Sequence, residues 1–154
     1  MSMASSVQLR GRAVRDPSRR RPVVAVALAA VQALVAVNAV IGGWQLIATG
    51  FGIPPEWLAR TPFSGWVWPG VLLWLTVGVP QFVGVGAALV RTPWWPQIGW
   101  RVGLLTGAGL LAWILVQLAV LQHYFFLQPV IAGVGLVEIA LAVGWRHLAT
   151  SRLG

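Results

Sequence analysis

The sequence predicts an all-α integral membrane protein, a bundle of four transmembrane helices with both termini on the cytoplasmic side. Three observations predict it: an apolar composition, four predominantly apolar stretches long enough to cross a bilayer, and an uneven distribution of Arg. Of the 154 residues, 58% are hydrophobic and 9% are charged, whereas soluble domains are about half apolar and a quarter charged. We therefore expect lipid to be the main solvent of the chain.

The composition also excludes several classes of protein. The chain contains neither Cys nor Lys, so it has no disulfide, no thiolate nucleophile and no Cys-ligated metal cluster. The net charge of +8 could indicate nucleic acid as a partner. However, six Arg crowd into the first 21 residues, and none forms a stripe with interleaved aromatic residues. We therefore expect no nucleic-acid partner and attribute the charge to membrane orientation.

The chain divides into a polar tail, an apolar domain and a short final tail. Residues 1–22 are rich in Ser and Arg and contain little to bury, which predicts a disordered cytoplasmic tail. Residues 23–146 form the predicted transmembrane domain, and residues 147–154 the second cytoplasmic tail. A bilayer-spanning helix needs about 20 apolar residues. The stretches that satisfy this requirement are about 23–47, 66–90, 99–121 and 126–145.

The orientation follows from the Arg residues beside the spans, because cytoplasmic flanks hold the excess of positive charge. With the amino terminus inside, Arg60 is the only Arg on the outer side. A cleaved twin-arginine signal is the alternative interpretation of the first span, since Ser18-Arg19-Arg20-Arg21 precedes it. That span is longer than the apolar core of such signals. Four spans in the cytoplasmic membrane are therefore predicted.

Small residues predict where the helices approach each other, since lipid provides no hydrophobic drive for their association. Gly99, Gly103 and Gly107 recur every four residues and form one smooth helix-packing face. Similar faces are formed by Ala25, Ala29 and Ala33, and by Ala140 with Gly144. Such a face serves either packing within one bundle or a homodimer interface, and packing within the bundle is favoured.

Polar residues within the spans fall into two layers when their depth is estimated at about 1.5 Å per residue. Gln32, Gln81 and Glu138 form the candidate inner layer, and Asn38, Thr76 and Gln117 a candidate outer layer. Glu138 is the only ionisable residue well inside a span. A carboxyl at this depth is costly unless it is neutral, paired or hydrated, and such residues often serve function. Glu138 either exchanges protons or only makes a hydrogen bond to Gln32 or Gln81, or reaches toward Arg146.

No catalytic or metal-binding set can be assembled from the remaining polar residues. His123 and His147 lie at opposite rims, about 36 Å apart if the segment between them were helical, so one haem could not take both as ligands. Glu56 and Arg60 have the spacing of a local ion pair on a short helix. The chain is therefore expected not to be an enzyme and to hold no cofactor or metal.

Four motifs lie in the predicted connections and at the ends or bends of the spans: the run GIPPEWLARTPF at 52–63, Trp68-Pro69-Gly70, Gly78-Val79-Pro80-Gln81 and Leu127-Gln128-Pro129-Val130. Together they resemble a recurring pattern in small four-helix membrane proteins of high-GC, actinobacterial-type bacteria. The likeness covers about residues 30–145 and implies four spans without catalytic residues. In architecture the chain also resembles the DoxX-type proteins.

Two functions remain open at this stage. The first is a non-enzymatic accessory or interaction subunit, and the second is a small oligomeric proton-coupled transporter that uses Glu138. The accessory function ranks first, because known small multidrug carriers have their essential acid in the first span. The expected partners are the lipid bilayer, a second copy or another membrane protein, and anionic lipid at the Arg-rich tail.

Overall fold

The computed structural model describes residues 17–90 and 95–150, and all regular structure in this part of the chain is helical. Four helical segments are long and apolar enough to cross a membrane, which confirms the predicted fold class. They cover Val23–Gly52, Val67–Leu89, Gln97–Leu121 and Leu127–Thr150. Each overlaps one predicted span.

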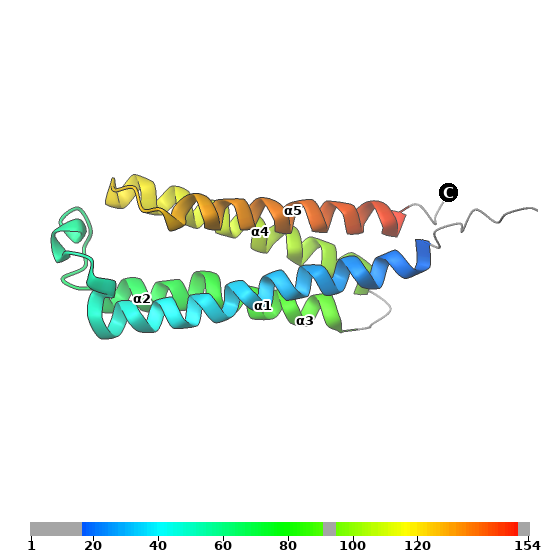
Figure 1. Ribbon diagram of the computed structural model, residues 1–154, viewed down its shortest axis with the longest axis horizontal. Coiled ribbons are helices and arrows are strands. Elements are labelled where there is room, and N and C mark those ends of the chain that lie inside the picture. The colour runs from blue at the N-terminus through cyan, green and yellow to red at the C-terminus, as the bar shows by residue number, and fades with distance from the viewer. Residues whose placement is uncertain (1–16, 91–94, 151–154) are drawn as a thin grey trace, which may run out of the picture.

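The elements follow in the order α1 (Pro17–Thr49), η1 (Gly50–Gly52), η2 (Pro55–Leu58), α2 (Val67–Leu73), η3 (Trp74–Gly78), α3 (Val79–Leu89), α4 (Trp95–Leu121) and α5 (Leu127–Thr150). Helix α1 packs against α2, α3 and α5, and α4 packs against α3 and α5, so the spans form a closed ring. The starts of α1 and α4 and the ends of α3 and α5 share one end of the bundle, here called the terminal end (Figure 1). The short helices η1 and η2 cover the opposite end, here called the loop end (Figure 1).

The helices at the terminal end extend beyond the predicted tail boundaries. Helix α1 begins at Pro17 rather than after Pro22, because proline suits the first helical turn, where its missing N–H needs no partner. Helix α5 continues to Thr150, so residues 147–150 are helical as well. The remainder of both predicted tails, residues 1–16 and 151–154, lies outside the described residues.

The second span is one continuous run in which α2 and α3 are joined by a π-helical turn, η3. In this turn the backbone N–H of Val79 bonds the carbonyl of Trp74, five residues earlier. Pro80 directly follows and has no N–H to offer to the preceding turn. The wider turn before Pro80 is thus the local response to a proline that the sequence places inside a span.

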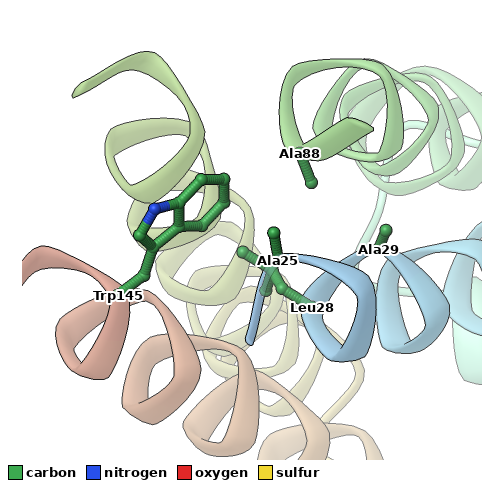
Figure 2. Packing of buried hydrophobic residues seen from close by; sticks show 5 residues of the cluster. All are labelled: Ala25, Leu28, Ala29, Ala88 and Trp145. Carbon is green, nitrogen blue, oxygen red and sulfur yellow. The ribbon is translucent and has the colours of Figure 1, made fainter. Parts of the chain in front are cut away.

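Two buried apolar clusters hold the bundle together, one on each side of the polar residues described below. Figure 2 shows the cluster nearer the terminal end, where Trp145 of α5 meets Ala25 and Leu28 of α1 and Ala88 lies across from them. The second cluster centres on Ala39, Val77 and Leu110. Most other large apolar side chains face outward: Leu105 is 72% exposed and Leu115 66%. This distribution is the one expected where lipid, and not water, surrounds the helices.

The loop end is closed by contacts between the two connections. Trp57 of η2 stacks on His123, with ring centres 4.2 Å apart, and Arg60 donates a hydrogen bond to Gln122. The predicted Glu56–Arg60 pair is therefore replaced by a contact of Arg60 with the α4–α5 connection. Gln128 fixes that connection from the first turn of α5, because it accepts a bond from the Phe125 N–H at 3.0 Å and donates to the His123 carbonyl at 3.3 Å.

Candidate intramembrane polar site

Glu138 lies inside the bundle and has no solvent-accessible or lipid-accessible surface, since its exposure is 0%. Helix α5 carries it on the face that packs against α4, one turn from Gly135 and Ala142, which are also buried. Small residues at these two positions let α4 approach closely. The carboxyl is thereby enclosed in the bundle, where its hydrogen-bond partner comes from α3.

Gln81 is the direct partner of this carboxyl. Its Nε2 donates to Oε2 of Glu138 at 3.2 Å, which joins α3 to α5. Gln81 stands in the first turn of α3, right after Pro80 and the π-helical turn, and is 1% exposed. The structure therefore brings together two of the three residues that sequence depth grouped, and it pairs Glu138 with a neutral amide.

Gln32 and Thr106 extend this contact into a network that includes all four spans. Gln32 of α1 is fully buried and donates from Nε2 to Oγ1 of Thr106 on α4 at 2.9 Å. The Thr106 hydroxyl also bonds the Gly103 carbonyl at 3.1 Å and interacts with the Glu138 carboxyl. We call Gln32, Gln81, Thr106 and Glu138 the polar centre.

Thr106 is a member that the sequence prediction did not include. Its position between Gly103 and Gly107 was the available signal, because three and four residues along a helix share one face. A hydroxyl on a small-residue face points toward the neighbouring helices and not toward lipid.

Two glycines make room for the polar centre. A Cβ at Gly84 of α3 would lie 2.7 Å from Cδ of Gln32, and a Cβ at Gly107 of α4 would lie 3.1 Å from Cβ of Glu138. Both distances are shorter than an ordinary van der Waals contact between carbon atoms. Glycine at 84 and 107 is therefore a steric condition for Gln32 and Glu138 to occupy their positions.

Three oxygens of the polar centre have no hydrogen-bond partner among the residues that the structure describes: Oε1 of Gln32, Oε1 of Gln81 and Oε1 of Glu138. Buried polar atoms in proteins are nearly always paired. No ion pair to Glu138 occurs among the described residues, and Arg146, a partner considered from the sequence, lies instead against the ring of Trp100. A carboxyl with only neutral neighbours can take up or release a proton without first breaking an ion pair.

The predicted outer layer does not form. Asn38 and Thr76 face the membrane, and each side chain bonds a backbone carbonyl of its own helix, Leu34 at 2.8 Å and Leu72 at 2.7 Å. Gln117 is only half-buried. Depth along a helix does not determine rotation about its axis, and a side chain that can bond its own backbone can face lipid.

The face of Gly99, Gly103 and Gly107 packs inside the bundle. A Cβ at Gly103 would lie 2.7 Å from a methyl group of Leu28 and 3.1 Å from Ala142, and Gly99 receives the indole of Trp145. Of the two interpretations of this face, packing within the bundle is therefore the one that the structure supports. The third small-residue face differs, because Ala140 is exposed and a Cβ at Gly144 would meet nothing within 4 Å.

No group of three His, Cys, Asp or Glu side chains that could hold a metal ion occurs in residues 17–90 and 95–150. His123 belongs to the contacts at the loop end, and His147 lies exposed at the terminal end.

No protein-family model, curated protein or solved structure matches this chain. The resemblance to small four-helix proteins of high-GC bacteria and to DoxX-type proteins thus stays a sequence-based expectation.

Proposed function

We propose that the chain is a small proton-coupled transporter of the cytoplasmic membrane, in which Glu138 takes up and releases the proton. The observation that carries the proposal is the placement of Glu138, which is fully enclosed and meets the neutral side chains of Gln81 on α3 and Thr106 on α4. Gln32 of α1 is linked to it through Thr106. Ionisable side chains inside a membrane are rare, and they mark proton relays and substrate pathways.

The unpartnered oxygens favour this role over a purely structural one. A carboxyl retained only to bind helices together is expected to have both oxygens paired, because each unpaired buried acceptor costs about 1–3 kcal/mol. Glu138 instead keeps Oε1 without a partner, and the two glutamines keep one oxygen each. A proton or water held among these oxygens would satisfy acceptors that the protein itself leaves open.

The second span supplies an element that could open the site. The π-helical turn η3 ends two residues before Pro80, and Gln81, the partner of Glu138, follows directly. Such turns interrupt the regular hydrogen-bond ladder and are frequent at functional sites. A shift of this turn toward α-helical pairing would rotate Gln81 relative to Glu138 and break the hydrogen bond between them.

Proton release on substrate binding tests this function directly. The purified protein in weakly buffered detergent is mixed with tetraphenylphosphonium and other lipophilic cations, and the pH is recorded. Release by the parent that is lost in Glu138→Gln supports the proposal. Glu56→Gln, which alters a carboxyl at the loop end, is the matched control and should release protons as the parent does. Equal release from Glu138→Gln and the parent would refute a role for Glu138.

An accessory or interaction subunit is the second candidate, and one observation favours it. Gly133, Ala140 and Gly144 share one face of α5 by helical spacing. A Cβ at Gly133 or Gly144 would meet nothing within 4 Å, and Ala140 is exposed. This face is open to a helix of another subunit. If it binds one, Gly133→Leu with Gly144→Leu will lower the molecular mass of the detergent-solubilised complex without unfolding the chain, and Glu138→Gln will leave that mass unchanged.

The proposed orientation places the terminal end in the cytoplasm. The described Arg residues support it, since Arg60 alone belongs to the loop end, whereas Arg19, Arg20, Arg21, Arg101 and Arg146 belong to the terminal end.

A further inference from the structure

Two guanidinium groups share one aromatic ring at the terminal end. The Cζ atoms of Arg101 on α4 and Arg146 on α5 lie 5.3 Å and 5.4 Å from the ring centre of Trp100. The two Cζ atoms are therefore no farther apart than the sum of these two distances. Trp100 is itself half-buried against the cluster of Ala25, Leu28 and Trp145, so its ring fixes where the two Arg side chains lie.

These two charges have no carboxylate partner in the described part of the chain. Its two acidic residues lie elsewhere, because Glu56 stands in η2 at the loop end and Glu138 is enclosed beside Gln81. Attraction to the ring holds each guanidinium in place, but it does not neutralise their mutual repulsion. An anion between them would do so.

The position along the membrane normal identifies the kind of anion. Arg101 lies four residues inside the start of its span at Gln97, and Arg146 lies four residues before the end of its span at Thr150. At about 1.5 Å per residue both are about 6 Å inside the span ends, so their exposed side chains reach the lipid headgroups. One turn deeper, Leu105 and Val143 are exposed, at 72% and 37%. A phospholipid has the same arrangement, with a charged headgroup at the membrane surface and apolar acyl chains below it. The two Arg side chains would therefore face its headgroup, and the exposed apolar side chains its acyl chains.

We propose that Trp100, Arg101 and Arg146 form a binding site for the phosphate of an anionic phospholipid, whose acyl chains lie along α4 and α5. Guanidinium groups bind phosphate oxygens with two parallel N–H donors, and this geometry favours Arg over Lys. The site is separate from the polar centre and does not depend on the function proposed for Glu138.

Lipid retention tests the proposal. The full-length protein is purified in detergent, titrated with equal amounts of phosphatidylglycerol or phosphatidylcholine, and examined by native mass spectrometry. The parent should retain phosphatidylglycerol in preference to phosphatidylcholine. Arg101→Gln and Arg146→Gln should each lower that retention by about fivefold, as expected for one surface Arg near anionic lipid. Arg60→Gln, at the opposite end, is the matched control and should retain the lipid as the parent does.

Three results would overturn the proposal. They are equal retention of the two lipids by the parent, unchanged phosphatidylglycerol retention in the double variant, and an equal loss in Arg60→Gln. Arg101 and Arg146 are exposed, so their substitution should leave the fold intact. Thermal unfolding of each variant checks this. An increase in melting temperature with inorganic phosphate as large as that with phosphatidylglycerol would assign the site to a free anion and would also overturn the lipid proposal.

Discussion

Gln81 donates a hydrogen bond of 3.2 Å from Nε2 to Oε2 of Glu138, and this contact joins α3 to α5 in the interior of the bundle. It is the closest link between the interrupted second span and the carboxyl. Substitutions at this contact and at the glycines beside it test the packing described above.

Replacing Gln81 by Leu should destabilise the protein. The substitution keeps a similar shape but leaves Oε2 of Glu138 without its amide donor, a loss of about 1–3 kcal/mol. The free energy of unfolding, measured by denaturant titration in detergent, should fall by this amount. The double variant Gln81→Leu with Glu138→Leu should lose less than the sum of the single variants, because it removes both partners together. Strict additivity would contradict the contact.

Gly107 and Gly109 should respond in opposite ways to the same substitution. A Cβ at Gly107 would lie 2.8 Å from the Gly135 carbonyl oxygen and 3.1 Å from Cβ of Glu138, whereas a Cβ at Gly109 would meet nothing within 4 Å. Gly107→Ala should therefore cost about 1–3 kcal/mol through overpacking. Gly109→Ala should be neutral or stabilise by up to about 1 kcal/mol, since Ala favours the helix. Thermal unfolding of the two variants checks this, and equal tolerance would refute close packing of α4 on α5.

The contacts at the loop end should protect the α4–α5 connection. Trp57→Leu removes the ring that stacks on His123, a contact worth about 0.5–1.5 kcal/mol, so amide hydrogen exchange of residues 122–126 should become faster. Trp44→Leu is the control, because Trp44 is 61% exposed to the membrane and should leave that exchange unchanged. Equal exchange rates of residues 122–126 in Trp57→Leu and Trp44→Leu would contradict the stack.

The orientation can be determined with single cysteines, because the native chain has none. Arg60→Cys at the loop end should react with a membrane-impermeant thiol reagent in intact cells, whereas Thr150→Cys at the end of α5 should react only after lysis. Labelling in the reverse order would place the terminal end outside.

The spans could be predicted from the sequence because each needs only length and apolar composition. The same criterion did not predict the helix ends, since α1 begins at Pro17 and α5 ends at Thr150. Backbone hydrogen bonds continue past the apolar stretch, so α1 starts before Val23 and α5 ends after Trp145. The interruption at Pro80 was visible in the sequence, but the five-residue turn that accommodates it was not, because a proline inside a helix is compatible with a kink as well as with a wider turn.

For the candidate site, the sequence gives the depth of a residue along its helix but not its rotation about the helix axis. Depth along each helix grouped Gln32, Gln81 and Glu138, and the structure buries all three. Depth alone could not separate them from Asn38 and Thr76, whose side chains bond their own helices and face the membrane. Thr106 was missed because the residues were grouped by depth alone, without regard to the small-residue face of Gly103 and Gly107 on which its hydroxyl lies.

The most direct test of the central claim is infrared difference spectroscopy of the protonated carboxyl. Spectra of the parent, Glu138→Gln and Glu56→Gln are recorded in lipid while the pH is changed reversibly. A proton-exchanging Glu138 predicts a pH-dependent component of the carboxyl carbonyl band that is present in the parent and in Glu56→Gln and absent from Glu138→Gln, in which only the other carboxyls contribute. Identical pH-dependent bands in the parent and in Glu138→Gln would contradict proton exchange at Glu138.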